Sequence, residues 1–226
     1  MTLNDTILVN LCNDIYSPQP DDYWEHFDSG AEDGICCGLK RLDGYDVIVL
    51  RGSVTAHDWV EDIRAIPVKT RIGTVHKGFY DGMEKLWAEL KPLLKQPVAV
   101  TGHSLGAARA DILAGLMTVG GVTPIRLSVF GEPKPGFGDF AKVIRDIPGE
   151  SYRNGSEHRF YDIVTFVPIT IKPLDAFVHR KPLVLLESPP PPALDQLSIF
   201  AFHHITLYAA AVAALKPEDI VNDQPD

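Results

Sequence analysis

Short apolar segments alternate with segments of helical periodicity through the middle of the chain, and this alternation restricts the folds open to it. Residues 47–50, 97–101 and 125–130 are largely apolar, as strands covered on both faces of a sheet are. The segment 104–118 keeps a helical period. Strands that alternate with helices build a largely parallel central sheet with helices on both faces, and sites in such a sheet lie beyond the carboxyl ends of its strands. We therefore expect an α/β fold.

Further elements are predicted on the N-terminal side of residue 97. The spacing of apolar residues predicts a first helix over about 3–16 and another helix over 78–95. The segments 35–39 and 46–50, joined by a turn at 42–44, predict a β-hairpin. Because the second arm of this hairpin is apolar without interruption, we expect it to lie inside the sheet.

Length and composition favour a single globular domain over residues 1–226. Apolar residues make up 45% of the sequence and charged residues 23%, close to the average for soluble proteins. No apolar run reaches the ~20 residues that cross a bilayer. The formal net charge of −9 would repel phosphate backbones, so we expect no nucleic-acid partner and prefer neutral substrates.

The N-terminus and the cysteines indicate the cellular setting. The first residues lack the basic start and the long apolar stretch of a secretory signal, so we expect a cytoplasmic protein. Cys36 and Cys37 are adjacent and would point to opposite faces of a strand, and Cys12 is the one other cysteine. We expect all three to be reduced and buried. No Cys/His spacing indicates zinc and no glycine-rich phosphate loop occurs, so we expect neither metal nor cofactor.

The segment 102–106, Gly-His-Ser-Leu-Gly, has the G-x-S-x-G pattern between a predicted strand and a predicted helix. This context is typical of a nucleophile elbow, in which Ser104 sits on a turn so tight that the residues two positions before and after it must be glycine. Ser104 is therefore the candidate nucleophile, and the backbone N–H of Leu105, at the start of the helix, is a candidate oxyanion donor. The side chain of His103 cannot turn back to Ser104, so we expect it to have a packing role.

Beyond the elbow, the chain resembles the class 3 lipases, a family that includes fungal triacylglycerol lipases. The resemblance implies an α/β-hydrolase fold, and it is weakest near the N-terminus and over 173–197. The matching segments fall in family order and are 50–53, 58–62, 75–79, 102–108, 129–133 and 162–164 with Pro168.

The resemblance also implies the acid of a catalytic triad, which in this fold follows the serine and precedes the histidine. Asp162 opens the matching Asp-Ile-Val segment after a strand expected at 159–161, and it is the candidate acid. Asp175 and Asp195 are the alternatives.

Three histidines follow Asp162 in the sequence. His179 matches a histidine that is structural in the family. His203 and His204 stand at the head of the last predicted helix, where the family has its base. The segment 200–212 is similar to bacterial relatives and favours His203, whereas the fungal pattern would favour His204.

The resemblance further implies a second oxyanion donor and a lid. Ser53 would donate both its backbone N–H and its side-chain hydroxyl to the oxyanion. Asp62 either accepts a hydrogen bond from the Ser53 hydroxyl or is simply solvated. The segment 54–63 occupies the family's lid position, as a mobile lid or a fixed cover. An apolar face is predicted for it, made by Trp59, Val60 and Ile63.

These observations together predict a carboxylic ester hydrolase that needs no cofactor, most simply a lipase for acylglycerols or related lipid esters. Its partners would be a small ester or lipid and, transiently, a lipid surface. One alternative is an esterase for short-chain or feruloyl esters. The other is a lipase-like binding module without turnover, since a fold alone does not establish activity.

Overall fold

The computed structural model describes residues 3–32, 34–53, 65–155, 161–168, 177–188 and 200–215, and the backbone of 222–223. The predicted lid 54–63, Asp62, Asp175, Asp195 and the proline-rich stretch 189–192 lie outside the described residues. Of the strand expected at 159–161, only Tyr161 is described, and it forms an isolated bridge with Gly155.

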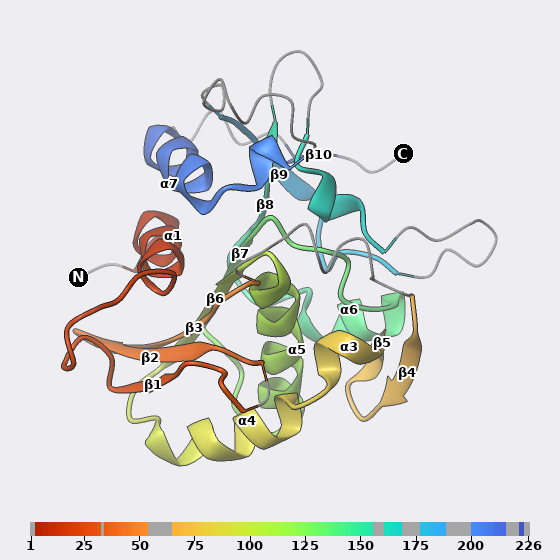
Figure 1. Cartoon of the computed structure of the whole chain (residues 1–226). Coiled ribbons are helices and arrows are strands. Elements are labelled where there is room, and N and C mark those ends of the chain that lie inside the picture. The colour runs from red at the N-terminus through yellow and green to blue at the C-terminus, as the bar shows by residue number, and fades with distance from the viewer. Residues whose placement is uncertain are drawn as a thin grey trace.

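An eight-stranded sheet forms the centre of the molecule, in the order β1-β2-β3-β6-β7-β8-β9-β10 (Figure 1). The five strands from β3 to β9 in this order are parallel, and antiparallel strands complete both edges. The predicted largely parallel sheet is therefore confirmed. The strands are β1 (His26–Asp28), β2 (Cys37–Leu42), β3 (Tyr45–Leu50), β6 (Val98–His103), β7 (Arg126–Phe130), β8 (Ser151–Gly155), β9 (Leu183–Glu187) and β10 (Asn222–Asp223).

Helices cover both faces of the sheet, and on each face an apolar core lies between the helices and the sheet. On one face α1 (Asp5–Asp14) packs beside α7 (Ile205–Ala214), over buried residues such as Val47, Val49 and Phe130 (Figure 1). The opposite core surrounds the buried α5. The elements on that side are α3 (Lys77–Tyr80), α4 (Met83–Leu90), η1 (Lys91–Leu93), α5 (Leu105–Val119), α6 (Gly138–Ile144) and the small hairpin of β4 (Pro67–Thr70) and β5 (Gly73–His76).

The first helix and the hairpin agree with the sequence prediction. Strands β2 and β3 pair in antiparallel register around a tight turn, where Gly44 has a φ of 86°. Strand β3 lies between β2 and β6, and its residues from Asp46 to Leu50 are buried, as its continuous apolar run predicted. The three cysteines are free and buried, also as predicted.

The prediction of one helix over 78–95 is wrong. Helix α3 ends at Tyr80 and α4 begins at Met83, because Gly82 between them has a left-handed φ of 83°. A Cβ atom at Gly82 would lie 2.5 Å from Cδ1 of Ile35, so the break also lets the chain pass close to the hairpin. The strand predicted at 97–101 is longer in the structure, since β6 continues to His103.

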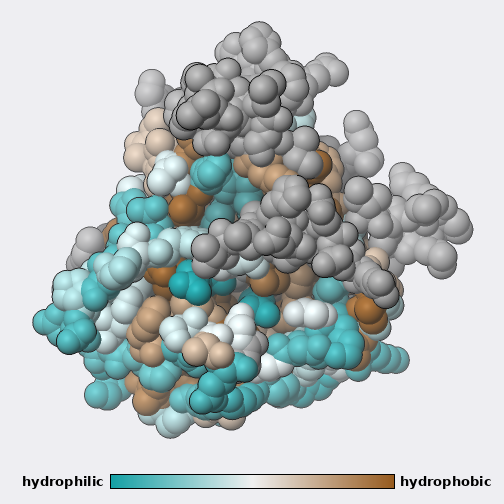
Figure 2. All heavy atoms as spheres, in the orientation of Figure 1, coloured by the Kyte–Doolittle hydropathy of each residue, from teal (hydrophilic) through white to brown (hydrophobic). Residues whose placement is uncertain are grey.

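The face shown in Figure 2 carries hydrophilic side chains around α4 and several separate hydrophobic patches. Among the helices of the described part, none is long and apolar enough to span a membrane.

Candidate active site

Ser104 stands at the junction of β6 and α5, where a sharp backbone turn holds it. Its φ of 60° and ψ of −132° are strained for a residue with a side chain, and no other non-glycine residue in the described part has a positive φ. Its backbone N–H donates to the carbonyl of Phe130 on β7, at 3.0 Å. The strand-turn-helix geometry expected of a nucleophile elbow is therefore present.

The two glycines of the motif allow this turn by removing steric clashes. A Cβ atom at Gly102 would lie 2.3 Å from the carbonyl oxygen of Gly106, and one at Gly106 would lie 2.2 Å from the carbonyl oxygen of Leu50. Helix α5 can thus begin directly against the ends of β3 and β6. Both glycines are required by close backbone packing rather than by their own φ angles.

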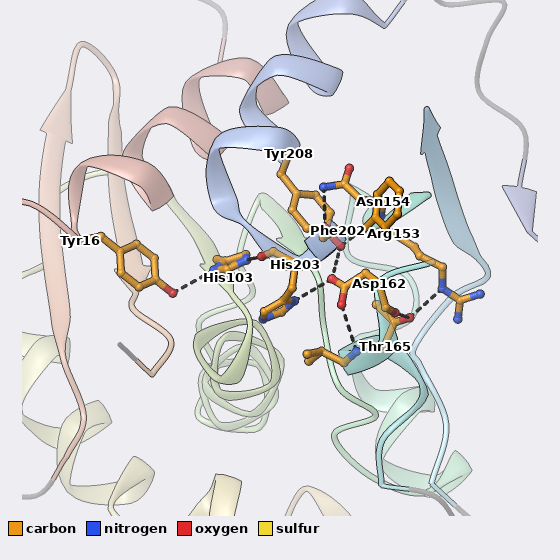
Figure 3. Close-up of polar contacts among 10 residues, drawn as sticks. Tyr16, His103, Arg153, Asn154, Asp162, Thr165, Phe202, His203 and Tyr208 are labelled. Carbon is orange, nitrogen blue, oxygen red and sulfur yellow. Dashed lines mark hydrogen bonds and ion pairs between the residues drawn. The ribbon is translucent and has the colours of Figure 1, made fainter. Parts of the chain in front are cut away.

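Asp162 directly precedes the short helix η2 (Ile163–Phe166) and faces His203, the last residue of η3 (Ala201–His203). Nδ1 of His203 lies 2.7 Å from Oδ2 of Asp162 (Figure 3). The backbone N–H of Val164 donates to Oδ1 of Asp162 at 3.0 Å. Asp162 is 0% exposed and His203 4% exposed, so this pair lies inside the protein.

The surroundings of Asp162 favour its charged form. Burial alone would raise the pKa of this carboxyl group. The charge and hydrogen bond of His203, with further hydrogen bonds from Tyr208 and Val164, outweigh burial and hold the pKa of Asp162 below its ordinary value. An ionised carboxylate at Nδ1 fixes the ring of His203 with its Nε2 atom available for proton transfer.

Nε2 of His203 and Oγ of Ser104 are the two atoms that a serine hydrolase would bring into contact. Both are buried, and neither has a hydrogen-bond partner among the residues that the structure describes. In free enzymes, catalytic hydrogen bonds are often open and close only around the substrate. Gly131 leaves room for the side chains of Asp162 and His203, because a Cβ atom at position 131 would lie 2.8 Å from Oδ2 of Asp162 and 3.1 Å from the His203 ring.

His203 and His204 have different environments, although they are neighbours in the sequence. His203 is buried against Asp162, whereas His204 is exposed and caps the N-terminus of α7. Of the two candidate bases, the structure therefore brings only His203 to the acid.

Ser53 and Leu105, the expected oxyanion donors, line a common hollow of about 100 Å³ next to the elbow. Leu105 is the first residue of α5, so its backbone N–H has no acceptor within the helix. Gly52 brings the end of β3 against the nucleophile, since a Cβ atom at this position would lie 2.7 Å from Cβ of Ser104. Arg51 and Arg109 also line the hollow, and they give it a polar wall.

Sequence reasoning missed the role of Tyr208 in this site. Its hydroxyl donates to Oδ2 of Asp162 at 2.6 Å and accepts the backbone N–H of Asn154 at 3.1 Å (Figure 3). The spacing of Tyr208 from His203 in the sequence gave no sign of this contact. The side chain of Asn154 holds the same region, because its Nδ2 donates to the carbonyl of Phe202.

His179 lies behind the acid and has structural contacts, as the family resemblance implied. Its ring nitrogens face Oε2 of Glu132 at 3.1 Å and the carbonyl of Thr165 at 2.9 Å. It is not part of a strand, but Val178 before it forms an isolated bridge with Gly136.

Two buried carboxyl groups lie in this region. Burial raises the pKa of Glu132. Burial and the neighbouring Glu132 carboxyl raise the pKa of Asp111 well above its ordinary value.

Within the described ranges, no cluster of three or more His, Cys, Asp or Glu residues could hold a metal ion.

A family model, described as lipase (class 3), matches residues 47–171, which is more than half of the chain. This chain belongs to the class 3 lipase family. The matched range contains Ser53, Leu105, Ser104 and Asp162, and it ends before His203.

Two curated relatives of this chain are fungal proteins. A lipase of Rhizomucor miehei is 35% identical in an alignment 137 residues long, which covers 54% of this chain and 37% of that protein. The secreted mono- and diacylglycerol lipase 1 of Fusarium solani is 29% identical in an alignment 119 residues long, which covers 47% of this chain and 35% of that protein. The alignments thus span about a third of the length of these relatives.

Solved structures show the same fold. A triacylglycerol lipase of Penicillium expansum superimposes with a TM-score of 0.65 over 81% of this chain and 79% of that chain, at 16% sequence identity. The likeness shows that this chain has the α/β-hydrolase fold, as the sequence predicted.

Proposed function

We propose that this class 3 lipase is a carboxylic ester hydrolase for acylglycerols or related lipid esters, with Ser104, His203 and Asp162 as its triad. One observation carries the proposal: the buried pair of Asp162 and His203 leaves Nε2 of His203 without a partner in the described part of the chain, and His203 packs on His103, which directly precedes the strained and equally unpartnered Ser104. The two curated relatives are a lipase and a mono- and diacylglycerol lipase, and this supports the substrate class.

The reaction proceeds in two halves through a covalent acyl-enzyme. Oγ of Ser104 attacks the ester carbonyl while Nε2 of His203 takes its proton, and Asp162 stabilises the imidazolium that forms. The backbone N–H groups of Ser53 and Leu105, together with the hydroxyl of Ser53, stabilise the oxyanion. His203 then gives the proton to the departing alcohol, and water releases the acid by the same steps.

The test is a hydrolysis panel of p-nitrophenyl esters from short to long acyl chains, together with emulsified mono-, di- and triacylglycerols. The Ser104→Ala variant should lose on the order of 10⁶-fold in kcat and keep its fold, because the nucleophile is removed and little else changes. A fluorophosphonate probe should label the parent at Ser104 and leave the variant unlabelled. An alanine variant within tenfold of the parent would exclude this mechanism.

A further inference from the structure

A chain of hydrogen bonds connects Gly52, two residues after the end of β3, with the backbone of His203, and Figure 3 shows its part from Tyr16 to His203. The backbone N–H of Gly52 donates to the hydroxyl oxygen of Tyr16 at 3.1 Å. The Tyr16 hydroxyl lies 2.8 Å from Nδ1 of His103, and Nε2 of His103 lies 2.8 Å from the backbone carbonyl oxygen of His203. Tyr16 and His203, which are distant in the sequence, thus both contact His103, the residue before Ser104.

The groups at the two ends of this series of hydrogen bonds determine which atom donates in each of them. The carbonyl of His203 can only accept, so Nε2 of His103 must carry a proton and donate it. Burial and the nearby His203 lower the pKa of His103 to about 3, so the ring is neutral and Nδ1 is an acceptor. The Tyr16 hydroxyl therefore donates to Nδ1 while it accepts from Gly52.

We propose that His103 and Tyr16 are positioning residues, which form a relay that ties the backbone of the base His203 to the oxyanion loop at Gly52. The relay acts at two places. At one end it holds the carbonyl of His203, at the junction between η3 and α7. At the other end it holds the peptide before Ser53.

Ring packing adds to the hydrogen bonds at the base. The rings of His103 and His203 stack with centroids 4.7 Å apart and planes 29° apart. Tyr16 meets the His103 ring edge-on, with centroids 5.7 Å apart. Because His103 is neutral, it supports the His203 ring without repelling the imidazolium that forms when Ser104 is deprotonated.

Both ends of the relay matter because catalytic groups tolerate little displacement. A misplacement of about 1 Å can cost about 10²-fold in rate. Gly52 contacts Ser104 closely, and it precedes the donor Ser53. The relay thus fixes the base and the oxyanion loop relative to each other, a role that rests on the proposed ester hydrolysis.

The kinetic test compares variants that remove the relay with one that preserves its polarity. Tyr16→Phe removes the shared hydroxyl, and His103→Phe keeps a ring but loses both hydrogen bonds. Each should lower kcat about 10- to 100-fold on a soluble p-nitrophenyl ester with KM within threefold, because positioning acts on the transition state. His103→Gln, whose amide offers one acceptor and one donor, should retain more kcat than His103→Phe.

The matched control is Tyr23→Phe, which removes the hydroxyl that donates to Asp14 in the same N-terminal part of the chain. Its kcat should stay within twofold of the parent. The proposal is overturned if Tyr16→Phe also stays within twofold, or if His103→Gln loses as much kcat as His103→Phe while both are folded by circular dichroism.

A second measurement does not depend on turnover. In the ¹⁵N-labelled parent at neutral pH, the NMR shifts of His103 should be those of a neutral ring with Nε2 protonated and Nδ1 bare. In Tyr16→Phe the Nδ1 signal should move, because its donor is lost. A ring with Nδ1 protonated would overturn the relay even if the enzyme is active. A parent that hydrolyses no ester but has the expected ring state would contradict the proposed function alone.

Discussion

The hydroxyl of Tyr208 and Nδ1 of His203 converge on the same oxygen, Oδ2 of Asp162, at 2.6 and 2.7 Å. The other oxygen accepts the backbone N–H of Val164. A fully buried carboxylate needs such donors, because without them burial would favour its neutral form. Tyr208 therefore helps to keep Asp162 charged, and the charge of Asp162 in turn holds His203.

Replacing Tyr208 by phenylalanine should affect both stability and catalysis. The variant removes one donor from Asp162 and leaves the buried N–H of Asn154 without its acceptor, which should lower the free energy of unfolding by about 1–3 kcal/mol. The kcat should fall roughly tenfold with little change in KM, since the acid acts through the base. Urea unfolding and steady-state kinetics measure the two effects.

Tyr152→Phe is the control for this variant. The Tyr152 hydroxyl donates to Oδ2 of Asp5, at a place where α1 meets β8 and no candidate catalytic group is involved. It should lose stability yet keep kcat within twofold. Equal kcat losses in Tyr208→Phe and Tyr152→Phe would show that Tyr208 supports the fold and not the acid.

The features that could be predicted from the sequence are those set by neighbouring residues. The elbow at Ser104 requires glycines at Gly102 and Gly106, and this requirement is visible in a short motif. The interior position of β3 followed from its unbroken apolar run. The positions of Asp162 and His203 followed from chain order and family resemblance, and the structure places these two side chains in contact.

The features that could not be predicted depend on residues far apart in the chain. The Tyr16 hydroxyl meets His103 across 87 positions, and Tyr208 meets Asp162 across 46. Neither pair leaves a periodic or spacing signal. The break at Gly82 was missed for a related reason, because apolar residues keep a helical period on both sides of it while the left-handed backbone at Gly82 separates two helices.

His203→Ala and His204→Ala should have very different effects. His203 is buried against Asp162, and its loss should lower kcat by at least about 10³-fold, as removal of a triad base does. His204 is exposed at the start of α7, and its alanine variant should stay within about tenfold. Kinetics on purified, folded variants decide the assignment. The reverse ranking would transfer the role of base to His204.

Ser53→Ala tests the oxyanion loop. Ser53 lines the hollow beside Ser104, and the loss of its hydroxyl should lower kcat by roughly 10²- to 10³-fold with KM almost unchanged, because an oxyanion donor acts mainly in the transition state. Ser29→Ala on the same hollow is the control and should have little effect on kcat. A rise in KM alone for Ser53→Ala would make Ser53 a substrate-binding residue.

Two buried neutral histidines should make the fold sensitive to acid. Burial lowers the pKa of His103 to about 3 and that of His179 to about 4, below the ordinary value of 6.5. Between pH 6.5 and 4 the unfolded chain therefore binds more protons than the folded protein, and the free energy of unfolding should fall as the pH decreases. Each group contributes a slope of about 1.4 kcal/mol per pH unit once its unfolded form is protonated.

The His103→Phe variant isolates one of these contributions. The raised pKa of Asp111 has the opposite effect on stability, since it favours the folded protein as the pH falls. Asp111 is present in both parent and variant, so its contribution cancels when their free energies of unfolding are compared. Urea unfolding at several pH values from 4.5 to 7.5 should show a shallower acid slope for His103→Phe than for the parent, by about 1.4 kcal/mol per pH unit at the acid end. Toward pH 7.5 the two slopes should converge, because His103 is then mostly neutral in both the folded and the unfolded protein. Parallel curves over the whole range would mean that His103 takes up a proton in the folded protein, and a protonated ring could not accept the hydrogen bond from Tyr16.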